Sequence, residues 1–174
     1  VGTFQIYATY QNVTSQTLEI KINPEPIEFK KRVLVEDYTG TWCGWGPRIS
    51  YALEKIQDQT NDVVIVAIHA GDPMQFNQLS TLTNVYNPQG TYPRGIINRS
   101  TLWNPAHESN IQQVTAQLYE PAYVGLATNS SVNGNNLSIT TKVKIGSSYS
   151  SLKLVVLILE DNLVYDQVNY TSYY

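Results

Sequence analysis

Two short apolar runs constrain the fold of this chain more than any other feature. Val33–Val35 and Val63–Ile68 carry no polar alternation, as expected for parallel strands that are covered on both faces. The residues between them repeat apolar side chains at the spacing of an amphipathic helix that begins near Pro47: Ile49, Ala52, Leu53 and Ile56. Strand, helix and strand within about 40 residues predict a right-handed βαβ unit.

The residues before this unit predict a hairpin. Residues 3–10 and 17–22 alternate apolar and polar side chains, which is typical of half-buried strands, and residues 11–16 can join them as an antiparallel pair. Because two strands alone are marginally stable, we expect this hairpin to be the last one of a larger β module. Residues 23–26, Asn-Pro-Glu-Pro, predict a stiff linker.

The residues after the unit predict further elements. Asp72-Pro73 and Asn104-Pro105 are cap-plus-proline pairs, which predict helix starts, and residues 95–98 predict a short strand between them. From Pro121 onward the pattern is that of β structure. It predicts a turn and then three strands, at residues 133–135, 137–145, 152–159 and 164–170. We expect this module to be cut short.

Composition excludes several classes of function. The 174 residues carry a net charge of −3 with only 11 Lys and Arg, which argues against a protein that neutralises nucleic-acid phosphates. The sequence contains no run of about 18 apolar residues, so it predicts no membrane-spanning helix. Cys43 is the single cysteine, so an internal disulfide framework and a Cys₄ or Cys₂His₂ zinc site are excluded. The chain starts at Val1 without an initiator Met, and we expect a processed or excised piece.

The segment that carries chemistry is residues 39–47, between the first parallel strand and its helix. A cysteine at the start of a helix faces unpaired backbone N–H groups and the positive end of the helix dipole, which favour the thiolate and lower the thiol pKa. Glycine and indole around Cys43 leave room for another chain to approach. The alternative interpretation is that Cys43 is a small buried hydrophobic residue, as lone cysteines often are.

A metal site is disfavoured. His69 ends the second apolar run and could join Asp72 and Glu36, but the chain has no His-x₃₋₅-His spacing. We expect neither a metal ion nor a cofactor.

The stretch Val33-Leu34-Val35-Glu36, followed by Trp42-Cys43-Gly44-Trp45-Gly46-Pro47, resembles the active-site segment of thioredoxin-like proteins, whose motif is Trp-Cys-x-x-Cys before a helix. Thr91-Tyr92-Pro93, just before the strand predicted at 95–98, resembles the cis-proline loop of that fold. More narrowly, residues 36–45, 69–72 and 93–99 are similar to the outer-membrane proteins of the twenty-eight-kilodalton class. These are thioredoxin-like surface or periplasmic proteins of Bacteroides-type bacteria.

The resemblance implies an organisation in three parts. An α/β thioredoxin-like three-layer domain would occupy residues 29–120. An immunoglobulin-like hairpin with its linker would precede it at residues 1–28, and a β-sandwich-type module would follow at residues 121–174. The implied location is extracytoplasmic, in the periplasm, at the outer membrane or on the cell surface of a Gram-negative bacterium. No transmembrane segment is expected, and a lipid anchor would lie outside this chain.

The resemblance also implies roles for particular residues. Cys43 would be the nucleophile, and Pro93 would be cis, so that the backbone of Tyr92 could pair with a partner peptide beside Cys43. Glu36 would be the buried acid that assists proton transfer, a role for which Asp37 competes because this loop has one residue more before the cysteine. The loop residues would complete the partner-binding surface: Trp42, Gly44, Trp45 and Gly46.

Gly46 is a departure from the motif, because it stands where the second cysteine is expected. In thiol–disulfide exchange the first thiolate forms a mixed disulfide, which the second thiol then resolves. Cys43 could therefore attack but not release its partner, and dithiol turnover would be lost or altered unless Gly46 is itself a substituted cysteine. Two functions remain open. One is monothiol exchange with a protein thiol, a protein disulfide or a low-molecular-weight thiol. The other is non-catalytic binding of a protein or glycan at the surface.

Overall fold

The computed structural model describes residues 2–6, 9–10, 12–22 and 27–174. The chain divides into two compact units. One consists of Val1–Lys30 and Pro121–Leu152, and the other of Lys31–Glu120 and Lys153–Tyr174. The division of the sequence into parts 1–28, 29–120 and 121–174 stays a prediction.

The second unit contains a mixed four-stranded sheet in the order β6-β5-β7-β8. Its strands are β5 Val33–Thr39, β6 Val63–His69, β7 Arg94–Ile97 and β8 Thr101–Trp103. β5 is parallel to β6 and antiparallel to β7, which is antiparallel to β8. The helix α1, Gly46–Gln57, connects β5 to β6, so the predicted strand-helix-strand unit is confirmed.

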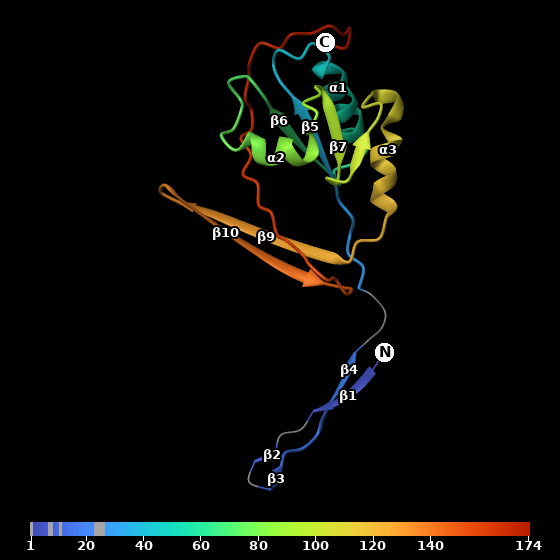
Figure 1. The fold of residues 1–174 in the computed structure, drawn as a ribbon, viewed down its shortest axis with the longest axis vertical. Coiled ribbons are helices and arrows are strands. Elements are labelled where there is room, and N and C mark those ends of the chain that lie inside the picture. Colours follow the sequence, from blue (N-terminus) through green and yellow to red (C-terminus); the bar gives the residue numbers. More distant parts are fainter. Residues whose placement is uncertain (1, 7–8, 11, 23–26) are drawn as a thin grey trace. The chain divides into compact units, whose positions relative to one another are not determined.

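Helices lie on both faces of this sheet (Figure 1). On one face, α1 and the short helix α3, Gln112–Thr115, pack against the sheet around Val35, Ile97 and Trp103. On the other face, α2, Leu79–Tyr86, packs against a second cluster around Tyr38 and Ile96. The predicted stripe of α1 is the buried one: Ile49, Ala52, Leu53 and Ile56. Two 3₁₀ turns, Glu108–Asn110 and Ala116–Tyr119, flank α3. Among the described residues, no helix combines the length and the apolarity needed to cross a bilayer.

The first unit is built from antiparallel pairs. β1 Gly2–Ile6 pairs with β4 Leu18–Ile22, and β2 Thr9–Tyr10 pairs with β3 Val13–Thr14, so the predicted hairpin is confirmed where the residues are described. Residues 7, 8, 11 and the linker predicted at 23–26 lie outside the described residues.

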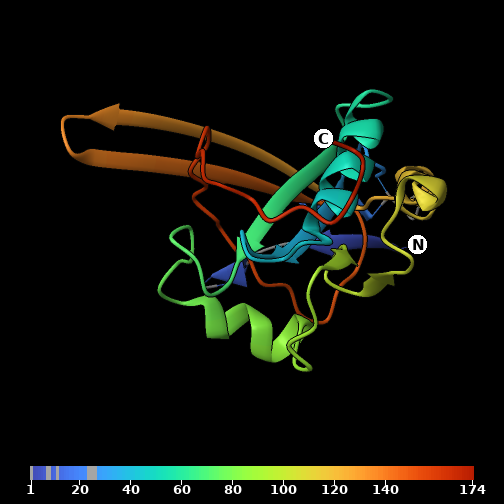
Figure 2. The ribbon, with the colours of Figure 1, turned by 90° about the horizontal axis from the view of Figure 1, so that it is seen from above.

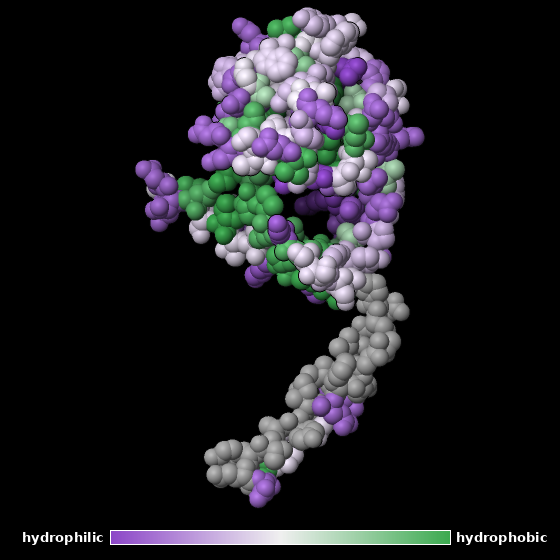
Figure 3. Space-filling model, in the orientation of Figure 1, coloured by the Kyte–Doolittle hydropathy of each residue, from purple (hydrophilic) through white to green (hydrophobic). Residues whose placement is uncertain are grey.

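A long hairpin completes the first unit. β9 Val124–Asn133 pairs with β10 Asn136–Ile145 across the predicted turn, where Gly134 has a φ of 57°. Figure 3 shows apolar surface gathered over this hairpin. Its exposed large apolar side chains are Leu126, Val132, Leu137, Ile139, Val143 and Ile145.

The strands predicted at residues 152–159 and 164–170 are wrong, because neither segment has regular secondary structure. An apolar run indicates only that its side chains favour burial. A strand also needs a neighbouring strand whose N–H and C=O groups hydrogen-bond to its backbone. The large apolar side chains of residues 152–159 are exposed.

The two helix starts predicted from proline pairs are also wrong. α2 begins at Leu79, and the carboxylate of Asp72 instead accepts hydrogen bonds from the backbone N–H groups of Thr41 and Met74. After Asn104, whose bond to Pro105 is cis, helical turns begin only at Glu108. In both places the Asp or Asn side chain, or the proline, forms part of a turn. The local sequence of such a turn is the same as that of a helix cap.

Ile49 provides a test of the core on the α1 face. Its side chain is fully buried, so we expect Ile49→Ala to lower the free energy of unfolding by about 3 kcal/mol, through lost burial and a residual cavity. Ser50, the next residue, is exposed, and Ser50→Ala should change stability by no more than about 0.5 kcal/mol. Urea denaturation of the three proteins measures both values, and similar effects of the two variants would contradict the assigned helix face.

Candidate functional site

Cys43 lies in the loop between β5 and α1, at the start of the helix. Its N–H donates to the carbonyl oxygen of Gly40 at 2.8 Å, and its carbonyl oxygen accepts from the N–H of Gly46 at 2.9 Å. These two bonds form consecutive turns at the start of α1. The backbone N–H groups of Trp45 and Gly46 act to lower the pKa of Cys43.

Three aromatic side chains lie around this loop. Trp42 and Trp45 are each about half exposed. The ring of Trp42 meets the ring of Tyr92 edge to face at 5.5 Å, and its Nε1 donates to the carbonyl oxygen of Ala70 at 2.6 Å. The peptide bond between Tyr92 and Pro93 is cis, so this prediction is confirmed. The structure therefore brings the Cys43 loop and the Tyr92–Pro93 loop together, as the sequence predicted.

The geometry at position 46 is that of a disulfide site. A Cβ atom added to Gly46 would lie 3.8 Å from the Cβ of Cys43. This separation equals the usual Cβ–Cβ distance across a disulfide, which is about 3.8 Å. The same added atom would lie 2.9 Å from Oγ1 of Thr39, so the threonine would have to shift slightly.

The structure separates the two candidate acids, Glu36 and Asp37, onto opposite faces of the sheet. Successive residues of β5 point to opposite faces of the sheet, and Glu36 points to the face that packs against α2. There its fully buried carboxylate accepts two hydrogen bonds from Arg99, at 2.9 Å from Nε and 2.7 Å from Nη2. The guanidinium of Arg99 also lies over the ring of Tyr86 on α2. Glu36 is thus a paired structural charge away from Cys43.

Asp37, the next residue of β5, points to the face that packs against α1. Its side chain is buried, and Oδ1 has no hydrogen-bond partner among the described residues. Burial without a compensating cation raises the pKa of the Asp37 carboxyl to about 7. Its charge in turn raises the pKa of Cys43, so the two groups interact.

The pKa of Cys43 was predicted to be lowered, and this is wrong for the thiol as the structure holds it. Burial raises the pKa of Cys43, and this effect exceeds the lowering by the N–H groups of Trp45 and Gly46. The charge of Asp37 acts in the same direction as burial, and that of Arg48 acts against it. The N–H groups at the helix start do lower the pKa of Cys43, but its burial, which leaves it only 5% exposed, is not apparent from the local sequence.

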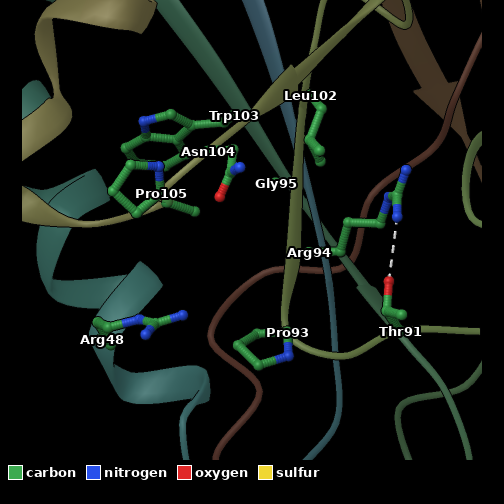
Figure 4. A pocket seen from close by; sticks show the side chains of 10 residues that line it. Arg48, Thr91, Pro93, Arg94, Gly95, Leu102, Trp103, Asn104 and Pro105 are labelled. Atoms are coloured by element: carbon green, nitrogen blue, oxygen red, sulfur yellow. Dashed lines mark hydrogen bonds between the residues drawn. The ribbon is translucent and has the colours of Figure 1, made fainter.

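Arg48 is a residue of the site that the sequence analysis missed. It lies in the first turn of α1 and reaches toward the side of Pro93, while Arg94 turns away to Thr91 (Figure 4). Both line a cavity of about 300 Å³, together with Trp103. Nε of Arg48 is buried without a partner among the described residues. Its position directly after the Gly46-Pro47 pair was the available signal.

His69 and Asp72 support the loop. Nδ1 of His69 lies 2.6 Å from Oδ2 of Asp72, and the same oxygen accepts from the N–H of Thr41 at 2.8 Å. Burial acts to raise the pKa of Asp72, but the hydrogen bonds from His69, Thr41 and Met74 outweigh it, so this pKa lies below its ordinary value. The pair fixes the start of the loop from the end of β6.

The C-terminal segment is a second component that the sequence did not predict. Residues 167–170 lie against the Cys43 loop, with hydrogen bonds described below. Contacts between residues more than 120 positions apart leave no local pattern in the sequence.

Comparisons with known proteins agree with an α/β protein of the cell envelope. The fold is similar to that of a solved structure, HBP35 of Porphyromonas gingivalis, with a TM-score of 0.57 and 18% sequence identity. The similarity covers 68% of this chain and 44% of that chain, so this chain spans less than half of that protein. At this identity the likeness concerns the fold alone. No curated protein matches the chain.

Residues 79–174 match the family model of the outer membrane protein Omp28, which is more than half of the chain. The chain therefore belongs to the Omp28 outer membrane protein family. The predicted extracytoplasmic location, at the outer membrane or surface of a Gram-negative bacterium, is confirmed.

Asp37 predicts a pH dependence of stability. Between pH 3.8 and about 7 the unfolded chain has released the Asp37 proton while the folded protein still holds it, so stability falls as the pH rises through this window. Asp37→Asn should remove this loss and raise the free energy of unfolding by about 4 kcal/mol at most near pH 8. Near pH 4 it should have little effect. Urea denaturation at the two pH values measures the change. The control is Asp161→Asn, because Asp161 is exposed and its replacement should leave the pH dependence of stability unchanged. If Asp37→Asn also left the pH dependence unchanged, the raised pKa of the buried Asp37 would be contradicted.

Proposed function

We propose that this envelope protein carries a thioredoxin-like domain in which Cys43 forms a mixed disulfide with a partner that carries a disulfide. The observation that carries the proposal is the distance of 3.8 Å between the Cβ of Cys43 and a Cβ added at position 46. A loop that holds these two positions at disulfide distance has the geometry of a two-cysteine motif. The cis bond before Pro93, the strand order and the buried Asp37 give independent support.

The proposed reaction is a single exchange step. Cys43 loses its proton, and its thiolate attacks one sulfur of a partner disulfide, so that a bond from Cys43 to that sulfur forms while the partner's S–S bond breaks. The other partner sulfur leaves as a thiolate. Asp37 is the group suited to receive the thiol proton, because its pKa of about 7 allows it to exchange protons near neutral pH.

The surrounding residues take the roles that the sequence analysis assigned to them. The half-exposed Trp42 and Trp45 offer apolar area to a partner, and Tyr92 extends this surface across the loop contact. Gly44 has no side chain, so another segment can lie directly on the backbone beside the thiol, as the ring of Tyr170 does. Pro93 places the Tyr92 loop next to the cysteine.

Gly46 restricts the proposed function to monothiol chemistry. Without a second thiol the mixed disulfide cannot be resolved internally, so release requires a thiol from outside. The partners that fit are therefore a protein disulfide, which Cys43 attacks, and a protein thiol or low-molecular-weight thiol, which then releases the mixed disulfide.

A second function is favoured by a different observation. Cys43 is 5% exposed and its pKa is raised, which are properties of an inert thiol. In this alternative the domain is a non-catalytic scaffold that binds a protein or glycan at the surface around Trp42 and Trp45.

The two functions predict different effects of Cys43→Ala: it should abolish disulfide exchange but should leave non-catalytic binding intact. Native protein is mixed with a disulfide-containing reporter peptide, and mixed disulfide is measured by mass. The proposed exchange predicts an adduct on Cys43 that an added thiol releases, and no adduct on Cys43→Ala. Absence of an adduct on the native protein, with full reaction in denaturant, would reject exchange in favour of the scaffold.

Restoring the second cysteine tests the geometry. We expect Gly46→Cys to form a disulfide with Cys43 on mild oxidation. The reduced variant should convert one equivalent of a protein disulfide into two thiols in a single turnover without added thiol, whereas the parent should stop at the mixed disulfide. Combining it with Thr39→Ala removes the crowding at 2.9 Å and should raise the yield of the disulfide.

The matched control for this experiment is Ser50→Cys, which places an exposed thiol one turn further along α1. It should leave two free thiols and no turnover. Free thiols in both Gly46→Cys proteins after mild oxidation would reject the two-cysteine geometry.

A further inference from the structure

The C-terminal segment pairs with the loop that carries Cys43. The N–H of Val168 donates to the carbonyl oxygen of Thr41 at 2.8 Å, and the N–H of Tyr170 donates to that of Gly44, also at 2.8 Å. The two acceptors lie on either side of Cys43 in the chain. The segment therefore crosses the loop at the cysteine, in the manner of an extended strand that pairs with it.

Side chains of the segment strengthen this contact. Nε2 of Gln167 donates to the carbonyl oxygen of Cys43 itself at 2.9 Å. The ring of Tyr170 meets the ring of Trp45 edge to face at 6.0 Å. A Cβ atom added to Gly44 would lie 2.6 Å from Cγ of Tyr170, so the ring rests directly on this glycine. The partner-facing features of the loop are thus occupied.

The end of the segment is fixed separately, on α1. Tyr173 stacks on Tyr51 with ring centroids 4.5 Å apart, and its hydroxyl lies 2.7 Å from Nε2 of His107. The hydroxyl of Tyr174 donates to the carboxylate of Glu54 at 2.6 Å. In Figure 2 the red C-terminal end lies beside α1, which is drawn in teal. Residues 167–170 are therefore held over the loop by contacts of their own and by an anchor that follows them.

This arrangement conflicts with disulfide exchange at Cys43. A partner sulfur must come within about 2 Å of the cysteine sulfur to form a bond, yet the thiol is only 5% exposed. The backbone acceptors of Thr41 and Gly44, on either side of Cys43 in the chain, already have donors.

We propose that residues 167–170 are an internal competitor that occupies the partner surface of Cys43, so that exchange requires them to leave. The inference rests on the proposed function of Cys43. It also defines the partner by chemistry: an extended peptide that offers backbone N–H groups at residues i and i+2, carries no charge, and places an aromatic ring against Trp45. The segment Gln167-Val168-Asn169-Tyr170 has these properties.

The first test compares reaction rates of Cys43 with a small aromatic disulfide reagent at one pH. Gln167→Ala and Tyr170→Ala should each raise the second-order rate constant about three- to tenfold, as expected for the loss of one hydrogen bond or one ring contact from the closed state. Tyr165→Ala is the matched control, because Tyr165 belongs to the same segment but has no hydrogen bond or ring contact with the Cys43 loop among the described residues. It should leave the rate unchanged.

The outcomes of this test separate the two proposals. Equal, fast rates in all four proteins would overturn the competitor and leave exchange at Cys43 intact. Equal rates that stay far below those of the denatured chains would overturn both. Acceleration in Tyr165→Ala as large as in Tyr170→Ala would also overturn the competitor, because loosening would then not depend on the contact with the loop.

The second test uses the parent protein, so it does not depend on how the variants fold. Amide hydrogen exchange is measured at Val168 and Tyr170 before and after Cys43 is joined by a disulfide to an uncharged, tyrosine-containing peptide. We expect both amides to be protected in the free protein and to lose that protection in the adduct. Protection that persists in the adduct would show that peptide and segment bind together, and would overturn the competitor.

Discussion

The two carboxyl groups nearest Cys43 in the sequence take their positions from the pairing of β5. This strand lies between β6 and β7 and is covered on both faces. Alternation along this strand places Glu36 on the α2 face, where it pairs with Arg99. It places Asp37 on the α1 face, where Oδ1 has no hydrogen-bond partner among the described residues. A shift of one residue in register would exchange the two acids. The sheet therefore determines which carboxyl meets the cysteine, before any feature of the loop is considered.

The same strand creates an energetic conflict at the site. An unpaired buried carboxyl lowers stability near neutral pH, and a buried thiol ionises less readily. Replacing Asp37 by a neutral residue would make the domain more stable near neutral pH, and exposing Cys43 would make its thiol more acidic. Perturbed groups of this kind cluster at functional sites, although structural networks produce them too. Here the carboxyl and the thiol lie within reach of each other's charge, whereas the equally buried Glu36 is fully paired. The contrast within one strand is consistent with the proposed site on the α1 face.

The sequence predicted what local patterns determine and missed what distant partners determine. The stripe from Ile49 to Ile56 specified α1, because its period is fixed by the helix itself. The Thr91-Tyr92-Pro93 motif correctly predicted a cis bond by resemblance. Residues 152–159 were read as a strand because they are apolar, but no ladder partner is encoded nearby. The sign of the Cys43 pKa shift failed for the same reason, since burial there depends on side chains brought in from elsewhere in the fold.

The anchor of the C-terminal segment has a consequence for how partners compete. While Tyr173 and Tyr174 remain on α1, residues 167–170 that leave the loop stay only a few residues from it. A short tether of this kind keeps a segment at an effective concentration of about a millimolar. A free peptide at about one micromolar would then need roughly a thousandfold higher affinity for the loop to occupy it half of the time. Selection at this surface would thus depend on local abundance as much as on complementarity, and would favour chains that are themselves concentrated at the same membrane.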